Sequence, residues 1–293
     1  MQAESKEFGN TETLTVSFVE TDHGRLRREQ RGIDKKALQA AKTYGAKRKG
    51  SNAKNGDPTA VYTYNSIVYV TNEKTGEERT SYALPLELEY VPISSNLQRE
   101  NNEALQKIKL DEESWLSNTV MVIDVSGSMK ESDVWGARTR LDAVRIAIAL
   151  DFIAQRLQAR SACPMDVVSI VTLGGGKNSS VIIHEQPCSW VLYNQIVSFY
   201  TNRILQPRGH GPYLPSLQNA ETLLTRNTNA SFALMFVFLS DGRPSDAHVN
   251  KSVSPAALSA TLAYRVGELS KKFGRRLTFA AIGIGTPDDF PVL

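Results

Sequence analysis

Cysteine is scarce in this chain, which holds only Cys163 and Cys188 among 293 residues. Two isolated cysteines exclude a disulfide framework and a thiolate zinc cluster, and they favour a reducing compartment. Long apolar runs are also lacking: the longest, 232–239, is about half of the roughly 18 residues that a membrane-spanning helix needs. Residues 1–10 are polar and contain no signal-peptide core. We therefore expect a soluble, cytoplasmic protein with no membrane partner.

The chain also lacks a strong excess of either charge, since 34 Lys and Arg face 31 Asp and Glu and leave a formal net charge of +3. With 41% hydrophobic residues it has enough apolar material for a core, and its length favours two domains. The charge is unevenly placed. Residues 22–54 hold eleven Lys or Arg against three acidic residues, which gives this window +8 and the remainder −5.

Residues 1–88 have the pattern of a small, basic α+β domain. Alternating apolar residues at 15–18 predict a first strand, and 25–44 has the spacing of two short helices. Residues 45–57, rich in Lys, Gly, Asn and Ser, are expected to form a mobile basic loop. A meander of three strands follows, predicted from β-branched and aromatic residues at 60–64, 67–71 and 78–84.

Residues 89–117 are expected to link the two domains through a polar helix at 97–115. From residue 118 to 293, apolar runs alternate with amphipathic helices. The predicted strands are 119–125, 166–173, 180–184, 232–240 and 277–284, and the predicted helices are 140–157, 190–200, 214–225 and 255–273. Such an alternation predicts a Rossmann-like α/β fold, with a mostly parallel sheet and helices on both faces. The short connection between the second and third strands requires a hairpin, so one edge strand is antiparallel.

Polar residues follow two of these strands where each one ends. The first strand runs into Asp124, Ser126 and Ser128 at its carboxyl end, and Asp241 follows the strand at 232–240. In open α/β sheets, ligands bind beyond the carboxyl ends of the strands. Two carboxylates and two hydroxyls suit Mg²⁺ or Mn²⁺, and they lack the sulfur and imidazole that zinc prefers.

The Asp-Val-Ser-Gly-Ser turn at 124–128, followed by Ser-Asp-Gly at 240–242, resembles the von Willebrand factor A domain over about residues 118–285. The resemblance implies a metal-ion-dependent adhesion site in which Asp124, Ser126, Ser128 and Asp241 bind the cation. It further implies an open coordination position that an Asp or Glu of a protein partner completes. The function expected from it is protein binding, in adhesion or assembly.

One loop departs from that family. The family has a Gly-Gly-Thr loop whose threonine contacts the cation, whereas this chain has Gly211 at the matching position, with His210 and Tyr213 as nearby alternatives. The missing threonine oxygen leaves cation affinity in question. The family also adds a helix, and often a sixth strand, after the fifth strand, so a domain incomplete at its C-terminal end is an open alternative.

Motifs for catalysis are missing from the second domain. It contains no Gly-x-Ser-x-Gly elbow, and its histidines lie in no recognisable catalytic pattern. The glycine-rich stretch 174–179 joins two strands instead of opening a helix, so it predicts a hairpin loop and not a phosphate loop. We expect a binding module and not an enzyme.

The basic window contains His23, Arg27 and Arg31 at intervals of four residues, ahead of a second helix and a sheet. This stretch resembles small domains related to RelE-like toxins over about residues 15–88, and some of those relatives are ribonucleases. The alternative function is therefore RNA binding or cleavage, in which these three residues share one helical face and contact phosphate. The competing hypothesis is a basic helix that only orients the sheet.

Overall fold

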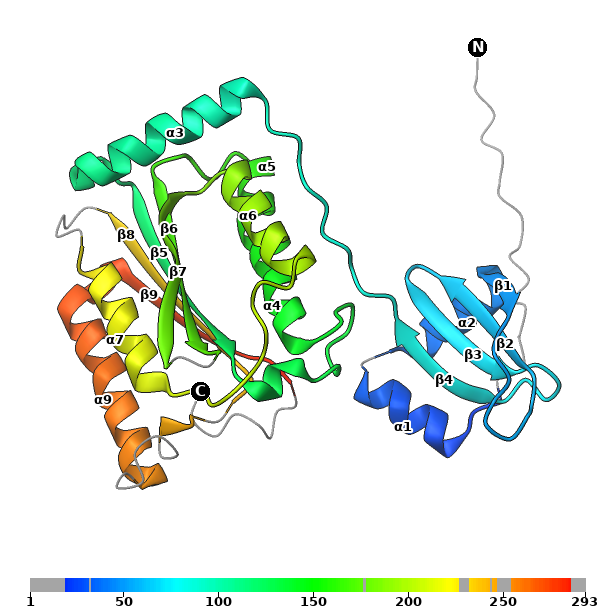
Figure 1. Ribbon diagram of the computed structural model, residues 1–293. Coiled ribbons are helices and arrows are strands. Elements are labelled where there is room, and N and C mark those ends of the chain that lie inside the picture. Colours follow the sequence, from blue (N-terminus) through cyan, green and yellow to red (C-terminus); the bar gives the residue numbers. More distant parts are fainter. Residues whose placement is uncertain are drawn as a thin grey trace, which may run out of the picture. The chain divides into compact units, whose positions relative to one another are not determined.

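The computed structural model describes residues 19–31, 33–175, 178–226, 232–242, 244–246 and 254–285, without the side chains of Arg27, Gln30 and Pro255. The chain divides into two compact units, Met1–Pro85 (the first unit) and Leu86–Leu293 (the second unit). Figure 1 shows the elements of each unit, which are described separately below. None of the described helices is both long and apolar enough to cross a membrane.

The first unit is an α+β fold with a four-stranded antiparallel sheet, in the order β1-β2-β3-β4. Its elements are α1 (Asp22–Gln30), α2 (Lys35–Tyr44), β1 (Ala46–Lys49), β2 (Thr59–Tyr64), β3 (Ile67–Asn72) and β4 (Glu78–Ala83). Asp34 caps α2 by accepting from the backbone N–H of Lys36 at 3.1 Å. Leu38 of α2 packs on Tyr69 of β3, and both side chains are fully buried.

Strand β1 corrects the sequence-based prediction of a mobile loop at 45–57. Ala46–Lys49 pairs with β2 along its whole length, although all four of its residues are exposed. An edge strand with both faces in solvent needs no apolar alternation, and lysines on it discourage further pairing. The strand expected at 15–18 lies outside the described residues.

The segment 89–117 is part of the second unit, which corrects the prediction that it is a linker. Helix α3 (Ser95–Leu110) buries Ile108 completely, and the indole N–H of Trp115 donates to the Ile108 carbonyl at 3.0 Å. The hydroxyl of Ser189 also donates to Oδ1 of Asn101 on this helix at 2.7 Å. The polar composition of α3 concealed a narrow buried stripe, which attaches the helix to the unit.

The second unit confirms the predicted fold class. Its five-stranded sheet has the order β7-β6-β5-β8-β9, and every neighbouring pair is parallel except β6 and β7. The strands are β5 (Ser117–Val125), β6 (Asp166–Gly174), β7 (Ser179–Pro187), β8 (Ala233–Ser240) and β9 (Leu277–Gly283). In order of appearance along the chain this arrangement reads 3-2-1-4-5, the start of the Rossmann order.

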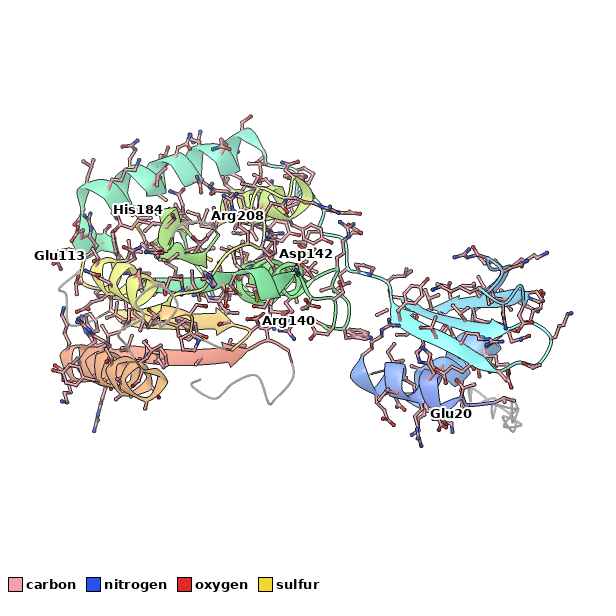
Figure 2. All side chains as sticks on the ribbon, turned by 60° about the horizontal axis from the view of Figure 1, so that its bottom comes forward. Glu20, Glu113, Arg140, Asp142, His184 and Arg208 are labelled. Carbon is pink, nitrogen blue, oxygen red and sulfur yellow. The ribbon has the colours of Figure 1, made fainter. Side chains whose placement is uncertain are left out.

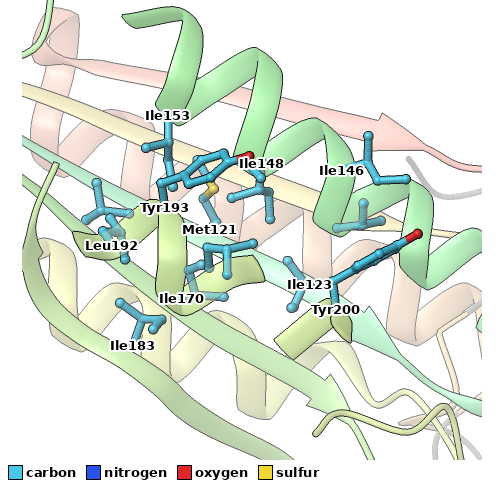
Figure 3. Packing of buried hydrophobic residues seen from close by; sticks show 14 of the residues in the cluster. Met121, Ile123, Ile146, Ile148, Ile153, Ile170, Ile183, Leu192, Tyr193 and Tyr200 are labelled. Carbon is cyan, nitrogen blue, oxygen red and sulfur yellow. The ribbon is translucent and has the colours of Figure 1, made fainter. Parts of the chain in front are cut away.

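Helices cover both faces of this sheet, as Figure 1 shows. One face is covered by α4 (Arg140–Ala147), the π-helical turns η3 (Ile148–Ala154), α5 (Gln155–Gln158) and α6 (Trp190–Thr201), and the other by α7 (Tyr213–Leu224) and α9 (Pro255–Phe273). Strand β5 contributes alternate residues to the two cores: Met121 and Ile123 to the first, Val120 and Val122 to the second. Figure 3 shows Met121 and Ile123 among the isoleucines and tyrosines of the first core.

Candidate functional site

The four residues predicted to bind a cation lie at the carboxyl edge of the sheet of the second unit. Strands β5 and β8 are parallel neighbours with Ile123 opposite Leu239, so the residues that follow each strand emerge side by side. Ser126 follows β5 directly and leads into the 3-10 turn η2 (Gly127–Lys130), while Asp241 follows β8 directly. Parallel pairing thus brings two distant loops to one place.

A continuous set of hydrogen bonds connects these residues. Oδ1 of Asp124 accepts from the backbone N–H of Ser126 at 2.7 Å, and Oδ2 accepts from the hydroxyl of Ser240 at 2.6 Å. The hydroxyl oxygens of Ser126 and Ser128 are 3.2 Å apart. Ser128 in turn donates to Oδ1 of Asp241 at 2.9 Å. Two carboxylates and three serines are therefore joined in one chain of hydrogen bonds.

Asp124 lies at the bottom of the cluster and is only 3% exposed. Burial raises the pKa of its carboxyl group, and the hydrogen bonds from Ser240 and Ser126 counteract part of that rise. The neighbouring Asp241 carboxylate raises the pKa of Asp124 further. A buried carboxylate next to a second one favours a nearby positive charge.

Gly211 faces this cluster from the loop before α7. A Cβ atom at position 211 would lie 3.5 Å from Oδ1 of Asp124 and 3.2 Å from Cβ of Ser126. The backbone of Gly211 is held by Ser245, whose hydroxyl accepts from its N–H at 3.0 Å. A side chain at this position would project into the cluster, whereas glycine contributes no side-chain oxygen to it.

The two alternatives proposed for that loop differ in position. The phenol of Tyr213 is buried and 2.8 Å from the hydroxyl of Ser240, so it reaches Asp124 through one intermediate residue. Burial raises the pKa of Tyr213 above that of an ordinary tyrosine, so the phenol stays protonated well into the alkaline range. His210 is exposed, and its backbone carbonyl packs against Gly174.

Sequence reasoning missed Arg140 and Asp133. The guanidinium of Arg140 donates from Nη1 to Oδ2 of Asp241 at 3.0 Å, and from Nε to Oδ1 of Asp133 at 2.9 Å. Figure 2 shows Arg140 at the end of the sheet toward which the strands point. Nothing in the sequence marks Arg140 as part of the site, apart from its position at the start of a predicted helix. Ser240, by contrast, stands within the Ser-Asp-Gly motif and could have been singled out.

Asp246 is a further missed residue, which supports the loop that carries Gly211. Its two carboxylate oxygens accept from the backbone N–H groups of Tyr213, at 2.7 Å, and Leu214, at 2.9 Å. These are the first two N–H groups of α7, which have no partner within the helix. A carboxylate at this end also complements the helix dipole.

A cavity of about 490 Å³ lies beside the cluster. Its lining includes Val125, the last residue of β5, Gly174, the last residue of β6, the following Gly175, and Arg208. The guanidinium of Arg208 donates from Nε to the carbonyl of Gly175 at 2.8 Å, which holds this exposed side chain at the rim. The cavity therefore combines accessible main chain with one positive charge.

Hard oxygen donors fit Mg²⁺ or Mn²⁺ at this edge. Within the described ranges of the chain, no three side chains of His, Cys, Asp or Glu gather into a metal-binding group. The donors of the cluster are two carboxylates and serine hydroxyls instead, a set suited to a hydrated divalent ion and unsuited to zinc.

The residues expected to contact RNA in the first unit do not form one helical face. Helix α1 ends at Gln30, and Arg31 turns onto β4, where its Nη1 donates to Oγ1 of Thr80 at 3.1 Å and to the Ser81 carbonyl. His23 is exposed on α1, and the side chain of Arg27 lies outside the description. The predicted shared face was therefore wrong, because contacts with the sheet take up Arg31.

Arg28 is the arginine that the sequence analysis overlooked in α1. It is buried, its Nη2 donates to Oε1 of Glu20 at 2.6 Å, and its Nη1 lies 3.6 Å from Oε2 of the buried Glu78. Burial raises the pKa of Glu78, and the charge of Arg28 opposes this rise. These contacts tie α1 to β4, in agreement with a helix that orients the sheet.

Comparison with known proteins gives a fold-level likeness only. No protein-family model matches the chain, and no curated protein matches its sequence. Among solved structures, the VWA domain of SpRpn10 is similar at 15% identity and a TM-score of 0.42, over 58% of this chain and 76% of that one. PilB minor pilin from Streptococcus sanguinis is similar at 15% identity and a TM-score of 0.41, over 82% of this chain and 66% of that one.

A von Willebrand factor type A structure from Catenulispora acidiphila is similar at 16% identity and a TM-score of 0.38, over 79% of this chain and 38% of that one. The strand order and the cluster define an α/β domain with a polar site at its carboxyl edge, and the similar structures include von Willebrand A domains. None of these structures supports the resemblance of the first unit to RelE-like toxins. A cytoplasmic location stays a prediction.

Proposed function

We propose that the second unit is a divalent-cation-dependent protein-binding module of the von Willebrand A type, acting in adhesion or assembly. The observation that supports it is the convergence of Ser126, Ser128 and Asp241 above the buried Asp124. The sheet topology brings together residues more than a hundred positions apart in the chain. The cluster lies at the carboxyl ends of the strands, where ligands of open α/β sheets bind.

Each residue of the cluster has a distinct part in the proposal. Ser126, Ser128 and Asp241 offer oxygens toward the ion, and Asp124 supplies the buried negative charge beneath them. Ser240 orients Asp124 by donating to its Oδ2 atom. A bound Mg²⁺ or Mn²⁺ would supply positive charge and a coordination position that a carboxylate can complete.

The expected partner is a protein that presents an Asp or Glu side chain. Arg208, at the rim of the neighbouring cavity, adds a positive charge that favours such an acidic segment. The cavity of about 490 Å³ leaves room for residues on one side of that carboxylate. Because Gly211 contributes no side-chain oxygen, we expect the cation to bind more weakly than at a site completed by threonine.

The proposal is tested on an array of peptides that differ in their acidic residues. We expect the chain to bind a subset of Asp- or Glu-containing peptides in Mg²⁺ and to lose them in EDTA. Ser126→Ala should abolish this binding, while Ser198→Ala, which changes a half-buried serine of α6 whose hydroxyl donates to the carbonyl of Gln195, should leave it unchanged. Equal binding in Mg²⁺ and EDTA would overturn the cation-dependent function.

The RNA alternative belongs to the first unit. Arg31 bonds to β4, and the neighbouring Arg28 is buried against Glu20 and Glu78, so these arginines serve the packing of α1. No observation on the described residues favours RNA over this structural role.

A further inference from the structure

Arg140 is a buried cation beside the carboxylate proposed to hold a metal ion. The residue is 7% exposed, and its Nη1 lies 3.0 Å from Oδ2 of Asp241. The other carboxylate oxygen, Oδ1, accepts from Ser128 at 2.9 Å. One of the two carboxylate oxygens of Asp241 is therefore already paired with a positively charged guanidinium.

Asp133 gives Arg140 a second anchor. Nε of Arg140 lies 2.9 Å from Oδ1 and 3.1 Å from Oδ2 of Asp133, and Nη2 bonds to the same carboxylate. The hydrogen bond to Asp133 raises the pKa of Arg140 most, and the one to Asp241 raises it further against the opposing effect of burial. The backbone around it is fixed, because Thr139 caps α4 by accepting from the N–H of Asp142 at 3.1 Å. Only the side chain of Arg140 would have to move to release Asp241.

The charges of the cluster set up a competition. Asp124, Asp241 and Asp133 together carry three negative charges, which balance one divalent ion and Arg140. If Arg140 stays on Asp241, however, the ion and the guanidinium share one carboxylate and lie a few ångströms apart, where like charges repel more strongly than in water. The ion and Arg140 therefore compete for one carboxylate.

We propose that Arg140 is an internal counter-cation that competes with the divalent ion for Asp241, and that Asp133 holds the guanidinium when the ion binds. This inference rests on the proposed function and deepens it, by naming the side chain that sets the cation affinity. In the competing hypothesis, Arg140 is a positioning residue that holds Asp241 in the orientation that binds the ion. The two roles predict opposite effects when Arg140 is replaced.

The experiment is calorimetric titration of Mn²⁺ into the full chain and its variants. Arg140→Gln should lower the Kd for Mn²⁺ roughly tenfold or more, because Asp241 is then free of the guanidinium. Asp133→Asn should raise the Kd, because the guanidinium then lacks the carboxylate that would hold it when it leaves Asp241. Arg138→Gln is the matched control: this half-exposed arginine lies two residues before Arg140 and pairs with Glu87, and its loss should leave the Kd unchanged.

The outcomes separate this inference from the proposed function. Mn²⁺ binding by wild type with an equal or higher Kd for Arg140→Gln overturns the counter-cation and leaves the function standing. Binding by Arg140→Gln alone supports the counter-cation and removes cation dependence from the wild type, and no binding by either variant or wild type overturns both. If circular dichroism shows that Arg140→Gln is unfolded, Asp133→Asn decides, since an unchanged or lower Kd contradicts the competition.

Discussion

The hydroxyl of Ser128 donates to Oδ1 of Asp241 across 2.9 Å, although 113 residues separate the two in the chain. The contact joins the turn after β5 to the end of β8, the two parallel strands at the centre of the sheet. Neither residue is near the other until both strands have paired. The candidate site is therefore a product of the folded sheet, and its properties can be tested by changing single side chains.

We expect the stability of the second unit to fall as pH rises through the raised pKa of Asp124, and Mg²⁺ to restore it. A carboxyl group with a raised pKa binds its proton more tightly in the folded state, so its contribution is present at low pH and is lost above the folded pKa. A cation that binds only the folded state offsets this loss. The measurement is Tm against pH in EDTA and in Mg²⁺, with Asp124→Asn as the reference. A pH profile of the variant that matches wild type in EDTA would contradict the prediction.

Replacing Gly211 with threonine should increase cation affinity by adding an oxygen at a position whose Cβ faces Asp124 at 3.5 Å. The new Cβ would also lie 3.2 Å from Cβ of Ser126, so a small shift is required. Gly211→Ala separates the two effects, because it adds the Cβ without the oxygen. Calorimetry with Mg²⁺ should give a lower Kd for Gly211→Thr than for Gly211→Ala. Equal values would show that position 211 does not reach the ion.

Tyr213→Phe should destabilise the protein by about 0.5–1.5 kcal/mol, the usual net worth of one hydrogen bond. The phenol is buried 2.8 Å from the hydroxyl of Ser240, which itself orients Asp124. Tyr193→Phe is the comparison variant, since Tyr193 is also buried and its ring packs in the opposite core. Urea unfolding measures both. A smaller loss for Tyr213→Phe than for Tyr193→Phe would mean that the Tyr213–Ser240 contact is not important for stability.

Arg31→Ala should destabilise the first unit by about 1–3 kcal/mol, because it leaves two partly buried acceptors of β4 without a charged donor. The guanidinium bonds to the hydroxyl of Thr80 and the carbonyl of Ser81. Arg25→Ala, which removes an exposed arginine of α1, should change stability much less. Urea unfolding tests this difference, and fluorescence anisotropy with single-stranded RNA tests the competing hypothesis. Unchanged stability together with loss of salt-dependent RNA binding would favour the RNA function.

The pattern of the sequence was sufficient to predict the second unit's architecture. Its strands are continuous apolar runs and its helices have a regular apolar spacing, and both signals are local. The short connection between β6 and β7 could join only antiparallel strands, so the antiparallel edge was also predictable. For 89–117 and β1 the local signal was misleading, because a narrow buried stripe or an exposed edge strand leaves little mark on composition.

The sequence by itself determined which oxygens stand at the ends of the strands: Asp124, Ser126, Ser128 and Asp241 follow apolar runs, and parallel strands end at one edge. Only the tertiary structure decided that Arg140 pairs with Asp241, since that contact spans 101 residues and depends on how one loop folds back. A strand's length and direction are set by neighbouring residues. The partner of a long, flexible side chain is chosen among all the charges that folding brings within its reach.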